Sequence, residues 1–170
     1  EAGDELFAGY EYLKTIAPSG LADELIDITN RLHNTALQRV DRSAASAGLL
    51  VHVPFTSPDV VEYAVRIPVE YKLHNGVEKW ILRRALDGGL PPSILARPKA
   101  KFWEGSGVAE LLAQHAESRI TDADFSRERT LENGWTLNSK EELLYYRLFK
   151  ERFGTVADLS WMGRTKTVAT

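Results

Sequence analysis

Apolar residues recur at helical spacing along most of the 170-residue chain. The first such run predicts a short helix over residues 4–13, with acidic residues in its first turn, where the helix dipole favours negative charge. The break at residues 18–20, Pro-Ser-Gly, is predicted to end it. A second, long helix is predicted from residue 21 to the neighbourhood of Gly48. Residues 49–53 form a β-prone run before a proline, which predicts a short strand or an extended crossing.

The middle of the chain carries clear start and stop signals. Residues 57–59, Ser-Pro-Asp, predict a helix start, since Ser is a good N-cap and Pro suits the first helical position. Asn75-Gly76 predicts a turn. A helix is predicted over residues 78–86 and is ended by Gly88-Gly89. Residues 91–93, Pro-Pro-Ser, are predicted to open another short helical turn.

The last third is predicted to hold three more helices. Their ranges are residues 108–118, 122–132 and 139–153, the last opened by the capping-box pattern Ser-Lys-Glu-Glu. Residues 96–107 lack periodicity and are basic, aromatic and rich in glycine, which is typical of a functional loop. We interpret residues 154–170 as a tail. With strand almost missing, the fold class is mostly α.

Composition excludes several classes of protein. The net charge of −3, from 21 Lys and Arg against 24 Asp and Glu, argues against a nucleic-acid partner, which would need a basic surplus. The absence of cysteine excludes thiol catalysis and Cys-based zinc sites. No apolar run approaches the roughly 20 residues of a membrane span, and the first residues lack the charged, then apolar, pattern expected of a leader peptide. Because the chain begins with Glu1 and its sole methionine is Met162, we expect a processed chain or a piece of a longer one.

Two segments carry candidate chemistry. The four histidines, at positions 33, 52, 74 and 115, show no metal-ligand spacing, and no glycine-rich nucleotide motif occurs. Residues 1–5 hold three carboxylates at a helix entrance. They either complement the helix dipole or form a divalent-metal or general-base site beside a phosphate. Residues 97–101 hold three cations, which form either a solvated cluster or a phosphate clamp.

Residues 3–10, Gly-Asp-Glu-Leu-Phe-Ala-Gly-Tyr, resemble the S-G-E-G-x-D-E-L-F-G-G-Y motif of the asparagine synthetase family. Further segments that resemble the family, in its order, are residues 39–42, 48–55, 60–64, 79–85, 90–91, 97–102 and 139–153. The resemblance covers about residues 1–153. It implies the mostly helical C-terminal portion of a synthetase domain with the α/β adenine-nucleotide-hydrolase-like (ATP-pyrophosphatase) fold, followed by the tail of residues 154–170.

The resemblance implies a cytoplasmic ligase of amino-acid biosynthesis that forms C–N bonds. In the family, ATP and Mg²⁺ adenylate a small-molecule carboxylate, aspartate in the name-giving members, and pyrophosphate leaves. Ammonia made from glutamine by a separate glutaminase domain then displaces AMP. The implied partners are an upstream part carrying the ATP loop, this glutaminase domain, and further copies or subunits in a homo- or hetero-oligomer.

The resemblance also implies roles for single residues. Glu1 falls on the acidic position linked to amine attack, where a carboxylate could take a proton from ammonia. Lys99 falls on the family's loop lysine, whose charge would stabilise the phosphorus transition state and the departing pyrophosphate. The residues implied to bind pyrophosphate and magnesium are Asp4, Glu5, Arg97 and Lys101. Of these, Asp4 is the implied metal ligand.

This chain also departs from the family's pattern. The S-G-G-x-D-S nucleotide loop is absent, so we expect the 170 residues alone to show no ATP–pyrophosphate exchange. Leu50 replaces Glu, His52 replaces Arg and Ser57 replaces Asp, although a place in the core would also explain Leu50. Ala8 stands for the first glycine of Gly-Gly-Tyr. Two alternatives stay open: a lactam or macrolactam synthetase that uses an internal amine, and a non-catalytic scaffold or regulatory subunit derived from the family.

Overall fold

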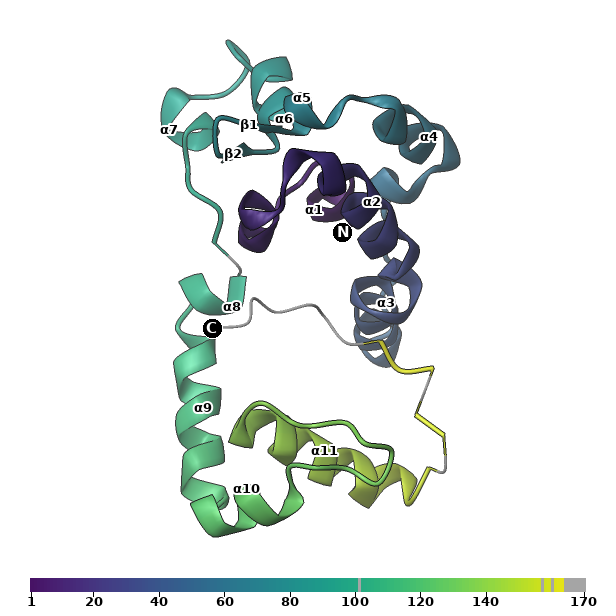
Figure 1. Ribbon diagram of the computed structural model, residues 1–170, viewed down its shortest axis with the longest axis vertical. Helices are drawn as coiled ribbons and strands as arrows, with labels where there is room; N and C mark the ends of the chain where they lie inside the picture. The colour runs from purple at the N-terminus through teal and green to yellow at the C-terminus, as the bar shows by residue number, and fades with distance from the viewer. Residues whose placement is uncertain (101, 157, 160, 164–170) are drawn as a thin grey trace. The chain divides into compact units, whose positions relative to one another are not determined.

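The computed structural model describes residues 1–100, 102–156, 158–159 and 161–163, which form two compact units (Figure 1). Unit 1 comprises Glu1–Lys99 with the described residues Met162 and Gly163, and unit 2 comprises the described residues between Ala100 and Trp161. Within the described ranges the regular structure is helical, apart from one two-stranded hairpin and an isolated bridge. The predicted mostly helical class is therefore confirmed.

Unit 1 consists of short helices that follow one another closely. Its first half contains α1 (Gly3–Leu6), the 3₁₀ helix η1 (Glu11–Thr15), α2 (Pro18–Asn30), η2 (Leu32–Asn34), α3 (Ala36–Ser46) and η3 (Pro54–Thr56). Its second half contains α4 (Pro58–Arg66), α5 (Val69–Lys72), β1 (Leu73–His74), β2 (Val77–Glu78), α6 (Trp80–Ala85) and α7 (Pro92–Leu95).

The two predicted N-terminal helices are both interrupted. The helix predicted over residues 4–13 is split into α1 and η1 because Ala8 takes a left-handed conformation with φ 56°. Residues 18–20 do not end a helix but begin α2, with Pro18 in the first turn, where its missing N–H costs nothing. The predicted long helix breaks at Thr35, which has φ −120° and ψ −101°. Apolar spacing continues across both breaks and so gave no sign of them.

Residues 49–53 form no strand, and Leu50 is not a core residue. The side chains of Leu49 and Leu50 are 66% and 83% exposed, which corrects the interpretation of Leu50 as core. No described segment pairs with these residues, and a strand without a partner leaves its backbone groups to water. The segment is therefore an extended crossing between α3 and η3.

The predicted turn at Asn75-Gly76 is confirmed as the tip of a hairpin. Asn75 and Gly76 have φ 49° and 76°, the two positive values that a type I′ turn requires. β1 and β2 pair antiparallel, with Leu73 opposite Glu78. The chain therefore reverses within two residues and delivers Glu78 and Lys79 to the start of α6.

The N-terminal segment is buried in the core of unit 1. One cluster of buried residues consists of Ala2, Leu6, Phe7, Leu32, Ala36 and Ala64, and a second of Ala8, Leu13, Leu21, Leu25 and Ile28. Because α1 and the turn after it contribute to both clusters, burial fixes their position. This matters for the charged residue that α1 carries, Asp4.

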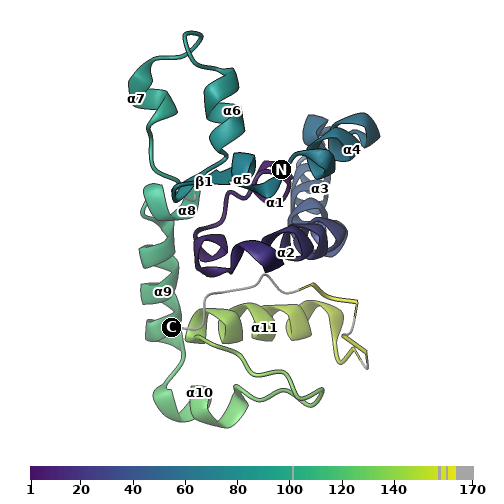
Figure 2. The ribbon, with the colours of Figure 1, turned by 45° about the horizontal axis from the view of Figure 1, so that its top comes forward.

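Unit 2 is a small helical assembly. It contains α8 (Phe102–Gly105), α9 (Val108–Arg119), α10 (Asp122–Glu128) and α11 (Lys140–Phe153). α11 packs against α9 and α10 (Figure 2) around the buried residues Ile120, Leu131, Leu137 and Leu143. The predicted loop over residues 96–107 holds the one-turn α8, and the helix predicted over 122–132 ends at Glu128, because Thr130 and Thr136 form a bridge.

The starts of α9, α10 and α11 lie at the predicted positions, whereas α8 was not predicted. Ser139 caps α11, its Oγ accepting the Glu142 N–H at 3.2 Å, and Glu142 Oε2 accepts the Asn138 N–H at 2.6 Å. Thr121 caps α10 in the same way, accepting from the Asp124 N–H at 3.1 Å. In the part of the chain that the structure describes, no helix has both the length and the apolar content needed to cross a membrane.

Replacing Ser139 by alanine should destabilise unit 2. The substitution removes the acceptor for the Glu142 N–H, and loss of an N-cap typically costs about 1 kcal/mol. Urea unfolding followed by the helical circular dichroism signal measures the change. Ser118→Ala is the matched control, because Ser118 bonds only within its own exposed helical turn. Equal effects of the two substitutions would contradict the capping role.

Candidate functional site

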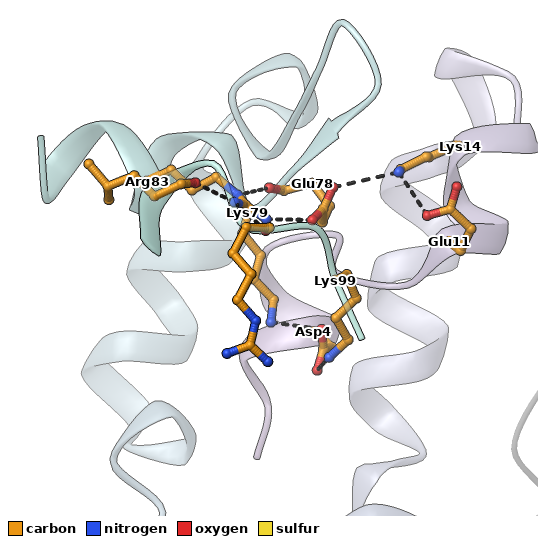
Figure 3. Close-up of polar contacts among 9 residues, drawn as sticks. Asp4, Glu11, Lys14, Glu78, Lys79, Arg83 and Lys99 are labelled. Atoms are coloured by element: carbon orange, nitrogen blue, oxygen red, sulfur yellow. Dashed lines mark hydrogen bonds and ion pairs between the residues drawn. The ribbon is translucent and has the colours of Figure 1, made fainter. Parts of the chain in front are cut away.

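Asp4 lies between two lysines that come from distant parts of unit 1 (Figure 3). Lys79 Nζ lies 2.8 Å from Asp4 Oδ1, and Lys99 Nζ lies 2.9 Å from Asp4 Oδ2. Asp4 belongs to α1, Lys79 is the N-cap of α6, and Lys99 follows α7. The three side chains are between 24% and 27% exposed. We call this arrangement the Asp4–Lys79–Lys99 cluster.

The cluster carries a net positive charge. Burial alone would raise the pKa of Asp4, but the hydrogen bonds and charges of Lys79 and Lys99 outweigh it and hold that pKa below its ordinary value. The carboxylate is therefore ionised at neutral pH and cancels one of the two ammonium charges. The remaining charge is partly exposed, which suits an incoming anion with several oxygens, such as a phosphate.

Gly9 makes room for the cluster. Its N–H donates to the Asp4 carbonyl at 2.7 Å, which turns the chain back over α1. A Cβ built at Gly9 would overlap Asp4 Oδ1 and Lys79 Cε, and would lie 2.8 Å from Asp4 Cγ. Any other residue at this position would displace the carboxylate or the lysine. The glycine is thus required by close packing rather than by its own torsion angles.

Left-handed backbone conformations surround the cluster. Ala2, Ala8 and Lys79 have φ 68°, 56° and 53°, a conformation that costs a non-glycine residue about 1–2 kcal/mol. Ala8 is the residue that replaces a glycine of the family motif, and a glycine would adopt this φ without cost. The Lys79 N–H donates to the Phe7 carbonyl at 3.1 Å and ties the start of α6 to the end of α1. Such conformations persist only where the surrounding structure fixes them.

Glu78, next to Lys79, forms a second charged group. Its side chain pairs with Arg83, and Lys14 Nζ lies 3.6 Å from its Oε2. Burial alone would raise the pKa of Glu78, but a backbone hydrogen bond and the charges of Arg83 and Lys14 lower it overall. Glu78 is thus a buried residue, only 6% exposed, and its carboxylate is ionised. Figure 3 shows it beside the Asp4–Lys79–Lys99 cluster.

The structure brings together two of the predicted site residues, Asp4 and Lys99. The Glu5 side chain, only 4% exposed, accepts a hydrogen bond from the Tyr10 hydroxyl, and burial raises its pKa. Glu1 is exposed at the start of the chain, and Arg97 is exposed in the loop after α7. Lys101 lies outside the described residues.

Sequence reasoning gave no role to Lys79. Lys79 lies in the segment 79–85, which the sequence analysis named only as one of the segments that resemble the family. Its partner Asp4 is 75 positions away in the sequence. The signal that could have found it is the Asn75-Gly76 turn. A tight hairpin fixes the direction in which the next residues leave it, and Lys79 is the first residue after β2.

The residues around Asp4 could supply only part of the ligands that a magnesium ion needs. Among the described residues, no three His, Cys, Asp or Glu side chains are grouped so as to hold a metal ion. Both carboxylate oxygens of Asp4 already face ammonium groups. Mg²⁺ is commonly held by one or two carboxylates together with substrate phosphates and water. Asp4 therefore fits magnesium only as a single protein ligand to an ion that arrives with a polyphosphate.

Comparison with known proteins gives consistent matches. Residues 17–162 match the family described as asparagine synthase. The chain is 34% identical over 164 residues to glutamine-hydrolysing asparagine synthetase 2 of Lotus japonicus and 33% identical over 164 residues to enzyme 1 of Arabidopsis thaliana. It is 32% identical over 175 residues to the glutamine-hydrolysing asparagine synthetase of Sandersonia aurantiaca.

These matches cover most of this chain but a smaller part of the relatives. They include 90%, 90% and 96% of the chain, and 28%, 28% and 33% of the three relatives. The chain thus spans about three tenths of the length of the relatives it matches. The family match begins at residue 17, so Asp4 and Gly9 precede it, whereas Lys79 and Lys99 lie inside it.

Replacing Gly9 by alanine should destabilise unit 1 by about 1–3 kcal/mol, the usual cost of overpacking a filled site. The new Cβ would meet Asp4 and Lys79 and force them apart. Gly20→Ala is the control, because Gly20 lies in α2 with only Ile16 Cγ2 within 4 Å, at 3.7 Å. Urea unfolding should show no loss for the control, and equal losses for both variants would contradict the packing requirement.

The contribution of Asp4 to stability should vanish in acid. Because the pKa of Asp4 is lower in the folded than in the unfolded chain, the ionised group stabilises the fold above its ordinary pKa of 3.8. That stabilisation is lost as pH falls through the lower, folded value. Asp4→Asn should therefore reduce the free energy of unfolding at pH 7 and make progressively less difference below pH 4.

The measurement is urea unfolding of both proteins across this pH range. Asp23→Asn, which changes an exposed aspartate of α2, should show no such pH-dependent difference. A gap between wild type and Asp4→Asn that stays constant down to pH 2 would contradict the ion-pair explanation.

Proposed function

The chain belongs to the asparagine synthase family, and from this membership we propose that it provides the pyrophosphate side of an ATP-dependent ligase that forms an amide through an acyl-adenylate. The observation that carries the proposal is the Asp4–Lys79–Lys99 cluster. Two ammonium groups share one carboxylate at a partly exposed position. The relatives' names, glutamine-hydrolysing asparagine synthetases, favour aspartate as the carboxylate substrate and glutamine as the nitrogen source.

The proposed first step is adenylation. An oxygen of the substrate carboxylate attacks the α-phosphorus of ATP, and the bond from that phosphorus to its bridging oxygen breaks. Pyrophosphate leaves with the electron pair, so negative charge grows on its oxygens. Lys79 and Lys99 would donate hydrogen bonds to those oxygens, and preorganised positive charge of this kind lowers the barrier most where charge develops.

Asp4 would hold the two lysines ready before ATP arrives. Without a carboxylate between them, the two ammonium groups would repel each other and move apart. With it, their positions are set in advance, and little reorganisation is needed at the moment of reaction. When bound with the polyphosphate, Mg²⁺ would neutralise further phosphate charge, with Asp4 as its protein ligand.

The second proposed step forms the amide. Ammonia attacks the carbonyl carbon of the acyl-adenylate, the bond to the phosphate oxygen breaks and AMP leaves. A base must take a proton from the attacking nitrogen, and Glu1 is the proposed base, since it is exposed at the entrance to α1. The ATP loop and the glutaminase activity are proposed to belong to partner segments, as in the longer relatives.

One observation bears on the choice of acceptor. Leu50, His52 and Ser57, which replace charged residues of the family pattern, are all exposed rather than buried. An exposed residue is free to contact a substrate, so these replacements support, as the second candidate function, a lactam or macrolactam synthetase that uses an internal amine. The intact Asp4–Lys79–Lys99 cluster argues against a non-catalytic scaffold.

The proposal predicts that pyrophosphate binds to the cluster. Lys99→Ala and Lys79→Ala should each weaken binding about 10- to 100-fold, because a hydrogen bond to a charged group contributes about 1.5–3 kcal/mol. Isothermal titration of the chain with pyrophosphate measures the affinity. Arg84→Ala is the control, since Arg84 is exposed on α6 and pairs with Asp87, at 3.0 Å.

Activity is tested in a chimera in which this chain replaces the matched segment of the Lotus japonicus relative. The chimera should catalyse ATP–pyrophosphate exchange, and Lys99→Ala should lower the exchange rate while leaving the circular dichroism spectrum unchanged. Unchanged binding and exchange in both lysine variants would overturn the proposed role of the cluster.

A further inference from the structure

Arg83 connects the two segments that carry the lysines of the cluster. Its Nε donates to the Glu78 carbonyl at 2.9 Å, and its Nη2 pairs with the Glu78 carboxylate. Its Nη1 donates to the Arg97 carbonyl at 3.0 Å and also to the Leu95 carbonyl. Figure 3 shows Arg83 and Glu78 beside the Asp4–Lys79–Lys99 cluster. One guanidinium thus binds the residue before Lys79 and two residues shortly before Lys99.

One of the two carbonyls is the last of a short helix, and the other lies two residues beyond it. Leu95 is the last residue of α7, and the last carbonyls of a helix have no partner within it. Arg83 supplies the missing donors and so fixes the direction in which the chain leaves α7. Between the bonded Arg97 carbonyl and Lys99 stands only Pro98, whose ring locks its φ and restricts the residue before it. Few free torsions therefore remain between Arg83 and Lys99.

The segment that leads into Lys79, which Arg83 also binds, is held in place as well. Glu78 is buried, pairs with Arg83 and lies near Lys14. It is followed directly by Lys79, whose N–H is held by the Phe7 carbonyl. The spacing of Lys79 and Lys99 therefore depends on Arg83 as well as on Asp4, which contacts both lysines. Arginine suits this task because its planar fork presents five donors in a rigid geometry, whereas a lysine offers a single ammonium group.

We infer that Arg83 is a positioning residue that sets the separation of Lys79 and Lys99 and thereby the affinity for pyrophosphate, an inference that rests on the proposed function. Arg83 acts through the peptide segments of residues 78–79 and 95–99. Its loss would leave both lysines present and charged but displaced from each other. The signature of such a residue is a loss of affinity without a loss of charge.

The test compares Arg83→Lys with Arg84→Lys. Both keep the net charge, and Arg83→Lys leaves an ammonium group for the buried Glu78 carboxylate, but one ammonium cannot also bond both carbonyls. We expect Arg83→Lys to weaken pyrophosphate binding about 10- to 100-fold, the loss expected when a displaced lysine no longer makes its hydrogen bond to a charged group. Arg84→Lys should bind as the wild type does.

A second readout does not depend on the proposed function. Hydrogen–deuterium exchange should be faster over residues 95–100 in Arg83→Lys and unchanged in Arg84→Lys, while exchange in α2 and α9 stays as in the wild type. Unchanged exchange over residues 95–100 would overturn the inference whether or not pyrophosphate binds. Faster exchange with unaltered pyrophosphate affinity would also overturn it, provided Lys99→Ala weakens binding. If the wild type binds no pyrophosphate, the proposed function is wrong. The inference that Arg83 sets the affinity by positioning Lys99 is then wrong as well.

A further variant covers the case in which Arg83→Lys does not fold. Glu78→Gln with Arg83→Gln removes both charges together, so that no buried carboxylate is left without a partner. It should fold, show the same local increase in exchange over residues 95–100, and bind pyrophosphate weakly. Wild-type affinity in this double variant would overturn the inference.

Discussion

Two positive charges held on either side of one carboxylate are the interaction around which the candidate site of unit 1 is arranged. Asp4 sits on a helix of four residues, which is too short to be stable by itself. What holds α1 in place is the burial of Ala2, Leu6 and Phe7 in one core cluster and of Ala8 in the other. The Asp4 carboxylate therefore has a fixed position, and its two ion pairs hold Lys79 and Lys99 beside it.

The arrangement requires strain and close contact at several points. Ala2, Ala8 and Lys79 adopt left-handed conformations, and Gly9 leaves no room for a side chain. Each of these features is unfavourable or restrictive alone. Together they bring the end of α1 against the start of α6, as the hydrogen bond from Lys79 to Phe7 shows. Strain collected around one charged group is typical of sites where geometry matters more than stability.

The sequence predicted local features well and long-range ones poorly. The cap at Ser139, the turn at Asn75-Gly76 and the starts of α9, α10 and α11 all depend on neighbouring residues, and they are confirmed. The breaks at Ala8 and Thr35 were missed because apolar spacing continues across them. The exposure of Leu50 was missed because a β-prone run does not reveal whether a partner strand exists. The predicted site residues Glu1, Asp4, Glu5, Arg97, Lys99 and Lys101 all remain predictions, although the structure brings Asp4 and Lys99 together.

The same distinction explains how the site came to be half predicted. Asp4 and Lys99 were singled out because their segments resemble motifs of the family. Lys79 and Arg83 could be linked to them only once the fold had brought residues 4, 79 and 99 together. Arg83 shows why: its contacts with Glu78, Leu95 and Arg97 are made mostly to backbone carbonyls. Every residue has a carbonyl, so no pattern of side chains in the sequence could show which ones an arginine would bind. An arginine that binds backbone carbonyls fixes the geometry of the chain on both sides of it, here the segments that precede Lys79 and Lys99.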